Sequence, residues 1–224
     1  MKKYKQLFLL LISLTLIMGM CGCTKKNDNT IDDVASYLSE QYNDTFSLVS
    51  SGNELWTEEY SEIVYTSKKL NSEIVARVYP NGAIIDNYIA VKYKTDVEQL
   101  VAPITEDVYG ETLVVNVPIH YGQKHFNKDL SFSDYIANKQ SDISIAIATY
   151  DNSENAREDI EKLILKFKEN GVIANIRVFY YTENEFKKIK VTNEATTIFS
   201  PLSDKRLSAT MNGDYSIGIV DWSE

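Results

Sequence analysis

Cysteine and glycine are both scarce in this sequence, and these shortages exclude disulfides in most of the chain and glycine-rich phosphate-binding loops. The two cysteines, Cys21 and Cys23, both lie before residue 24 of a 224-residue chain. The rest of the chain therefore has no disulfide and must fold on a hydrophobic core. The 9 glycines include no GxxxxGKS/T or GxGxxG phosphate-binding loop. Neither a GxSxG nucleophile elbow nor the SxxK, SDN and KTG set of penicillin-binding enzymes occurs.

Positive charge is also in short supply. The 23 basic residues are outnumbered by 32 acidic ones, which gives a net charge of −9 and a pI near 4.9. Because nucleic-acid binding requires a basic surface that neutralises phosphates, no nucleic-acid partner is expected. An apolar fraction of 44% and a charged fraction of 25% are typical of a globular protein, and they exclude wholesale disorder, collagen and a multi-span membrane protein.

The start of the chain differs in composition from the rest. Lys2, Lys3 and Lys5 precede an almost unbroken apolar run over residues 7–20, which is the order of the n-region and h-region of an export signal. At about 14 residues, the run is shorter than the ~20 that a permanent membrane-spanning helix needs. The pattern therefore predicts export rather than a membrane span.

The apolar run ends in Met20-Cys21-Gly22-Cys23, which resembles the lipobox of bacterial lipoprotein precursors. In that motif a bulky apolar residue, a small residue, and Gly or Ala precede an invariant cysteine. Cys23 fits better than Cys21, because Gly22 precedes Cys23 whereas the large Met20 precedes Cys21. The resemblance implies diacylglycerol on the Cys23 thiol, cleavage before Cys23, and acylation of the new amino group, palmitate being the usual acid. An uncleaved anchor helix and an ordinary signal peptide cut elsewhere are the alternatives.

The lipobox resemblance divides the start of the chain into two parts. Residues 1–22 are expected to be a lipoprotein signal peptide, and residues 23–29 the acylated cysteine with a short polar tether. The membrane is then a partner through the lipid anchor, with about 0.8 kcal/mol for each buried CH₂. The expected location is the extracytoplasmic face of the cell membrane of a Gram-positive bacterium.

Periodicity and turn residues predict the elements of the body. A helix is expected over 30–42, where Thr30 can cap it and apolar side chains recur on one face. A second helix is expected from the capping box Thr95-Asp96-Val97-Glu98 to Gly110, with Pro103 kinking or dividing it. A third helix is expected from a cap at Ser153 to about Asn170, and a weak helical turn at 133–138. Strands are expected at 45–50, 61–67, 73–79, 83–94, 112–121, 142–150, 172–181, 206–211 and 214–221.

This order of elements predicts an α+β fold, with helices packed on a mainly antiparallel sheet. The helix that begins at Ser153 and its two flanking strands predict a βαβ unit in the C-terminal third, in which the strands are either neighbours or separated by another strand. A boundary near 122–132 would divide the body into two similar lobes, an N-terminal one at 30–121 and a C-terminal one at 133–224. One continuous domain fits the pattern equally well.

Two groups of side chains are candidates for chemistry. His120, His125 and Asp129 could hold zinc, but their spacing matches no familiar motif, and loop or surface histidines are favoured. Residues 54–62 mix the four carboxylates of Glu54, Glu58, Glu59 and Glu62 with Trp56 and Tyr60. Such a mixture can serve glycoside hydrolysis or bind a cationic ligand, but a solvated loop whose tryptophan packs into the core is favoured.

Tyrosine is abundant, with 15 residues. Tyrosine suits half-buried sheet positions, and it also suits recognition surfaces because its ring is rigid and its hydroxyl is adaptable. Strand packing is the favoured interpretation, whereas a sheet face of exposed tyrosines would be the best candidate for binding peptide or glycan. The tyrosines in or beside expected strands are Tyr60, Tyr65, Tyr79, Tyr88, Tyr93, Tyr121, Tyr150, Tyr180 and Tyr181.

These observations favour a membrane-tethered, non-enzymatic binding or accessory protein whose ligand is a peptide, a glycan or a protein. An exported hydrolase acting on cell-wall material and an immunity or inhibitor lipoprotein are the alternatives. The sequence assigns no catalytic residue, metal or cofactor, and its single assigned site is lipidation at Cys23.

Overall fold

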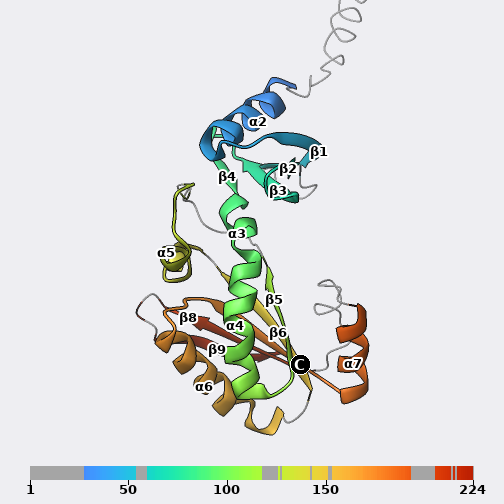
Figure 1. Ribbon diagram of the computed structural model, residues 1–224, viewed down its shortest axis with the longest axis vertical. Coiled ribbons are helices and arrows are strands. Elements are labelled where there is room, and N and C mark those ends of the chain that lie inside the picture. The colour runs from blue at the N-terminus through green and yellow to red at the C-terminus, as the bar shows by residue number, and fades with distance from the viewer. Residues whose placement is uncertain are drawn as a thin grey trace, which may run out of the picture.

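The structure is a computed structural model that describes residues 28–53, 60–117, 126, 128–141, 143–150, 153–192, 205–212, 214 and 216–223. Its strands form two sheets, one with the order β1-β2-β3-β4 and one with the order β5-β6-β7-β8-β9. All neighbouring strands are antiparallel except β6 and β7. Helices pack on both sheets (Figure 1), so the predicted α+β class is confirmed.

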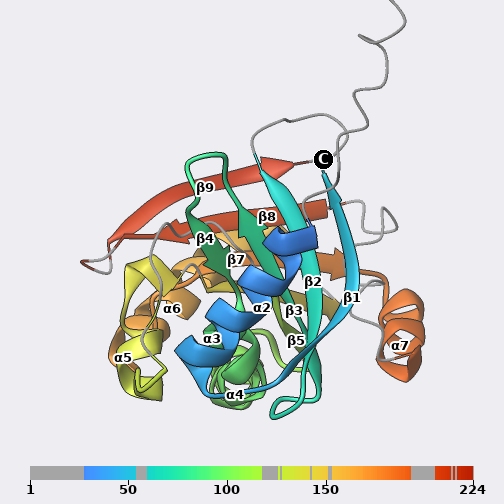
Figure 2. The same cartoon turned by 90° about the horizontal axis from the view of Figure 1, so that it is seen from above.

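The first sheet consists of β1 (Phe46–Asn53), β2 (Ser61–Ser67), β3 (Ser72–Val78) and β4 (Ile84–Asp86). Helix α2 (Asp28–Tyr42) lies over one face of this sheet, as the view from above shows (Figure 2). The apolar face predicted for the helix is confirmed, because Val34, Leu38 and Tyr42 are buried. The hydroxyl of Tyr65 donates a 2.6 Å hydrogen bond to the Ile31 carbonyl and joins the helix to β2.

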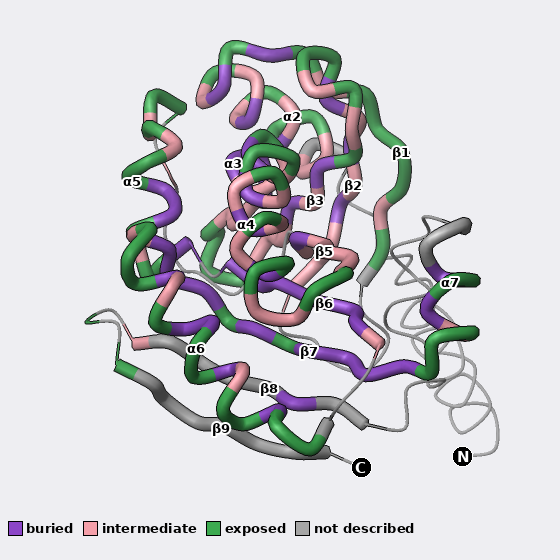
Figure 3. Tube along the Cα trace, turned by 60° about the horizontal axis from the view of Figure 1, so that its bottom comes forward, coloured by how far each residue is buried: buried purple, intermediate pink, exposed green. Residues whose placement is uncertain are grey.

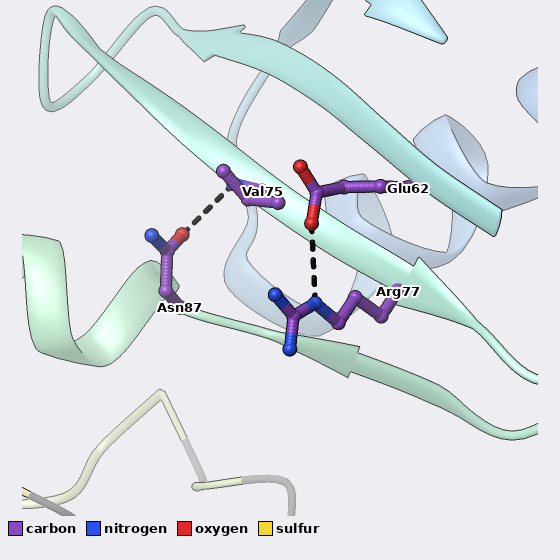
Figure 4. A network of polar contacts seen from close by, with 4 residues as sticks. All are labelled: Glu62, Val75, Arg77 and Asn87. Atoms are coloured by element: carbon purple, nitrogen blue, oxygen red, sulfur yellow. Dashed lines mark hydrogen bonds and ion pairs between the residues drawn. The ribbon is translucent and has the colours of Figure 1, made fainter. Parts of the chain in front are cut away.

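The strand predicted over 83–94 is wrong after Asp86, where the chain turns into helix α3 (Tyr88–Lys92). Asn87 ends the ladder, because its side-chain Oδ1 accepts the backbone N–H of Val75 at 2.9 Å (Figure 4). The carboxylate of Asp86 accepts the N–H of Tyr88 at 2.9 Å. The backbone N–H of Asn87 still donates to the Val75 carbonyl at 3.3 Å, but the Asn87 side chain takes the place of its own carbonyl as acceptor, and the Asp86 carboxylate satisfies a free donor at the helix start.

Helix α4 (Lys94–Tyr109) follows at once and ends at Gly110, whose φ of +76° suits glycine. Pro103 lies inside α4 and does not divide it. The capping box predicted at Thr95 is wrong, because α4 already begins at Lys94 without a side-chain cap. The Glu98 carboxylate instead accepts the backbone N–H of Asn116 at 3.0 Å and fastens α4 to the edge of the second sheet.

The second sheet consists of β5 (Thr112–Val117), β6 (Ser144–Tyr150), β7 (Asn175–Tyr181), β8 (Lys205–Met211) and β9 (Ile217–Ser223). Strands β6 and β7 are parallel neighbours joined by α6 (Ala156–Glu169). The βαβ unit is therefore a direct crossover with no strand inserted between its strands. The predicted cap at Ser153 is wrong: the turn η2 (Ser153–Asn155) comes first, and Asn155 stands at the N-cap.

The two faces of β6 bury different side chains. Ile145 and Ile147 belong to the main core with α6, whereas Ala146 and Ala148 face the other side of the sheet. There they meet Phe186 of helix α7 (Glu183–Thr192). Helix α7, which was not predicted from the sequence, follows β7 and precedes β8 along the chain, and it covers part of the sheet face opposite α6.

A continuous buried cluster runs from the first sheet to the second (Figure 3). Tyr93 at the start of α4 packs on Tyr135 of helix α5 (Phe132–Ile136), with ring centroids 5.3 Å apart. The short helix η1 (Lys139–Ser141) then leads to β6. In sequence the two sheets divide between β4 and β5, and the proposed pair of similar lobes stays a prediction.

Candidate functional site

The face of the first sheet that points away from α2 presents a ladder of paired side chains. Along β2, Ile63, Tyr65 and Ser67 are buried, so the alternate residues lie on the opposite face. The register of β2 and β3 places each of these alternate residues directly opposite a residue of β3. The pairs are Glu62 with Arg77, Val64 with Val75, and Thr66 with Glu73.

An aromatic pair completes the ladder at the end of β2 and β3. Tyr60 immediately precedes β2 and Tyr79 immediately follows β3. Their ring centroids are 5.6 Å apart, with the rings tilted by 50°. We call Tyr60, Glu62, Arg77 and Tyr79 the outer-face cluster.

Arg77 lies at the centre of the outer-face cluster. Its Nε is 3.1 Å from Oε2 of Glu62 (Figure 4), and its guanidinium carbon is 4.5 Å from the centre of the Tyr60 ring. The side chains of Arg77 and Glu62 are 20% and 31% exposed. Ion pairing and stacking on the ring fix the orientation of the guanidinium, and such preorganisation reduces the entropic cost of binding a ligand.

The chemistry of the outer-face cluster is that of recognition. It offers two rings with apolar faces and phenolic hydroxyls, one planar cation with several donors, and one carboxylate acceptor. These groups can contact a ring or an extended chain and hydrogen-bond its polar atoms.

The outer-face cluster takes two residues from the segment singled out in the sequence, Tyr60 and Glu62. The other residues of that segment, Glu54, Trp56, Glu58 and Glu59, lie outside the described residues, as do His120, His125 and Cys23. Asp129 is exposed. Across the described ranges, the structure brings together no group of three or more His, Cys, Asp or Glu residues that could hold a metal ion.

Arg77 and Tyr79 were missed as site residues, although a signal was present. The turn between the two strands is centred between Lys69 and Leu70, so Glu62 and Arg77 lie at equal distances from it along the hairpin. Tyr60 and Tyr79 are related in the same way. Pairing the residues by hairpin register would have found both.

Strand packing is confirmed for Tyr65, Tyr180 and Tyr181, whereas Tyr88 and Tyr93 are buried but lie in α3 and at the N-cap of α4. Tyr150, like Tyr60 and Tyr79, is half-buried, and Tyr121 lies outside the described residues. The buried ones are Tyr65, Tyr88, Tyr93, Tyr180 and Tyr181.

Two carboxylates, that of Asp44 after α2 and that of Asp86 at the end of β4, connect elements of the first sheet through hydrogen bonds. Asp44 accepts the N–H groups of Thr45 and Lys69 at 2.6 and 3.1 Å, the hydroxyl of Tyr88 at 3.2 Å, and the hydroxyl of Ser67. Burial alone would raise the pKa of Asp44, but these hydrogen bonds, that of Ser67 first, outweigh it and lower the pKa. Burial, and then the charge of Asp44, raises the pKa of Tyr88 to about 12.

Asp86 accepts the hydroxyl of Tyr42, whose ring stacks on Tyr88. The Tyr42 hydroxyl donates to both oxygens of Asp86, at 2.8 and 3.0 Å. The rings of Tyr42 and Tyr88 are stacked, with centroids 4.0 Å apart. Burial, followed by the charge of Asp86, raises the pKa of Tyr42 and keeps its hydroxyl a donor.

In the described part of the chain, no helix combines the length and apolar character that crossing a membrane requires.

No protein-family model matches the sequence, and no curated protein matches it. Among solved structures, the crystal structure of a DUF5037 family protein from Ruminococcus gnavus ATCC 29149 is similar, at 15% sequence identity and a TM-score of 0.42. The match covers 82% of this chain and 91% of that chain.

Proposed function

We propose that this protein is a lipid-anchored, non-enzymatic binding or accessory protein on the extracytoplasmic face of a bacterial cell membrane. The observation that carries the proposal is the order of a basic start, an apolar run over 7–20 and the lipobox-like Met20-Cys21-Gly22-Cys23. Two or more acyl chains at Cys23 would make a stable anchor, because each buried CH₂ contributes about 0.8 kcal/mol.

The position of the first described helix sets how close an anchored body would lie to the membrane. Helix α2 begins at Asp28, so residues 24–27 alone lie between Cys23 and the helix. At roughly 3.4 Å per residue, five steps of extended chain reach about 17 Å at most. A body held this closely belongs at the membrane surface.

The side chains of the outer-face cluster support binding rather than catalysis. Arg77 and Glu62 neutralise each other, and Arg77 stacks on Tyr60. The carboxylates of Asp44, which is buried, and of Asp86, which is half-buried, are engaged by hydroxyl and backbone donors of the scaffold. We therefore assign recognition of a peptide, glycan or protein ligand to the outer-face cluster.

Metabolic labelling with palmitate tests the anchor. The wild-type protein should take up label and sediment with membranes, whereas Cys23→Ser should lose the label and accumulate as the uncut precursor. The matched control is Cys21→Ser, which removes the neighbouring thiol and should leave labelling intact. Undiminished labelling of Cys23→Ser would refute the assignment.

Co-sedimentation with purified cell-wall sacculi tests the ligand class. The acylated protein in detergent should sediment with the sacculi, and the double variant Tyr60→Ala/Tyr79→Ala should bind about tenfold more weakly, since each aromatic contact contributes ~0.5–1.5 kcal/mol. Arg157→Ala on α6, where the side chain is 77% exposed, is the control and should bind like the wild type. Equal binding by the double variant would remove the ligand site from the outer-face cluster, and no binding by the wild type would exclude the cell-wall polymer as ligand.

A further inference from the structure

The body is elongated, and α2 lies at one end of its long axis (Figure 1). The second sheet and α6 lie at the other end, and α4 runs along the axis between them. The 16 residues of α4 span about 24 Å at 1.5 Å per residue. This is more than the ~17 Å that residues 24–27 can reach when extended. An anchor at Cys23 therefore strongly favours an orientation in which the α2 end is the end nearer to the membrane.

Charge adds a second constraint at the attached end. Helix α2 contains Asp28, Asp32, Asp33 and Glu40 and no basic residue. Asp32, Asp33 and Glu40 are exposed. An anionic bilayer repels such a helix within about one Debye length, which is ~8 Å at physiological salt. The helix should therefore not lie flat on the lipid headgroups.

We infer that the anchored protein stands on its α2 end, with the first sheet toward an anionic bilayer and the second sheet and α6 directed away from it. The inference rests on the proposed acylation of Cys23. The surface facing the membrane is then the acidic helix, separated from the headgroups by water. The surface that soluble macromolecules meet first is the end formed by α6 and the second sheet.

Energy transfer from a single site on the protein to an acceptor dye in the bilayer tests this orientation. Ser36 on α2 is exposed, and Leu165 on α6 is 57% exposed, so each can be replaced by Cys and labelled. The new thiol is the sole free one, because residues 1–22 are removed and Cys23 is acylated. The acylated variants are inserted into vesicles of phosphatidylcholine with phosphatidylglycerol.

The label at Ser36→Cys should lie closer to the bilayer than the label at Leu165→Cys, by a distance of the order of the ~24 Å length of α4. Equal distances, or a closer Leu165→Cys, would overturn the orientation even when mass spectrometry shows the acyl chains in place. A protein without acyl chains would instead refute the proposed anchor, and the orientation with it. The two failures are therefore distinguishable.

Neutralising the helix tests the charge argument separately. In the Ser36→Cys protein, Asp32→Asn/Asp33→Asn should bring the label closer to anionic vesicles and leave its distance from pure phosphatidylcholine vesicles unchanged. The control Glu158→Gln/Glu161→Gln on α6 removes the same charge at the far end and should leave both distances unchanged. An Asp32→Asn/Asp33→Asn protein that stays at the wild-type distance from anionic vesicles would overturn the role of charge.

Discussion

Removing the carboxylate of Asp44 should destabilise the fold by an amount that the structure allows us to estimate. Ser67 is fully buried and Tyr88 is 5% exposed, so in Asp44→Ala both hydroxyls lose their acceptor without gaining water. A buried O–H left without an acceptor costs ~1–3 kcal/mol, although the Ser67 oxygen still accepts the Leu70 N–H at 3.0 Å. The N–H donors of Thr45 and Lys69 belong to exposed residues and can turn to water. The expected loss in the free energy of unfolding is therefore about 2–6 kcal/mol.

Urea unfolding followed by circular dichroism measures this loss as a fall in the midpoint at unchanged slope. Asp44→Asn keeps one acceptor oxygen and should lose about half as much, roughly 1–3 kcal/mol. The control Glu73→Gln, at an exposed position of β3, should stay within about 0.5 kcal/mol of the wild type. An Asp44→Ala protein as stable as the control would refute the role of this carboxylate.

The pH dependence gives an independent check of the Asp44 prediction. The pKa of Asp44 is lower in the folded protein than its ordinary value, so the folded state favours the charged form. Its stabilising contribution is fully present above the ordinary Asp pKa of about 4 and is lost as the pH falls through the lowered value. The stability difference between wild type and Asp44→Asn should therefore shrink below about pH 4. A difference that stays constant on acidification would contradict the network.

Three further predictions concern packing, capping and the independence of the body. Phe167→Ala, which empties a fully buried site, should lose ~3–5 kcal/mol in urea unfolding, whereas Leu165→Ala on the exposed side of α6 should stay within about 0.5 kcal/mol; similar losses would show that the core is misplaced. Thr182→Ala should cost ~1 kcal/mol and speed hydrogen exchange in α7, while Thr95→Ala should be nearly neutral; the reverse result would restore the cap at Thr95. The fragment of residues 30–224 should be soluble and monomeric and should melt cooperatively at the same temperature with and without reductant; aggregation would contradict a self-sufficient core.

The elements that could be predicted from the sequence are those in which one local pattern dominates. Helix α6 buries Ile160, Leu163 and Phe167 as its periodicity predicts, and β6 alternates isoleucine and alanine between two faces. Both signals arise from burial on a fixed period, which each short segment carries within itself. The α+β class follows from the order of such segments.

The elements that could not be predicted depend on distant partners or on preceding structure. Residues 83–94 contain β-branched and aromatic side chains that favour a strand, but the ladder ends where the Asn87 side chain accepts the Val75 N–H, and the Asp86 carboxylate accepts the N–H of Tyr88 at the start of α3. Both 95–98 and 182–185 match the capping-box pattern, and at Thr182 the box forms, because its Oγ1 accepts the N–H of Glu185 and Glu185 accepts the N–H of Thr182. That segment follows a strand, so its free donors need a cap, whereas Thr95 lies after residues that are already helical.

In the outer-face cluster, too, some residues are marked by their local segment and others depend on a distant partner. Tyr60 and Glu62 were recognisable as a mixture of aromatic and acidic residues within one segment. Arg77 and Tyr79 join them through the register of β2 and β3, which pairs residues far apart along the chain. The segment that contains Tyr60 and Glu62 could therefore be singled out from the sequence, with a solvated loop as its favoured interpretation, whereas Arg77 and Tyr79 could not.

The central claim is that a lipid on Cys23 holds the folded body at the outer face of the membrane. Mass spectrometry of the N-terminal peptide of the protein purified from native membranes tests it most directly. The account predicts a peptide that begins at Cys23 and carries the added mass of diacylglycerol and of an amide-linked fatty acid. A native protein that still carries residues 1–22, with Cys23 unmodified, would contradict the account.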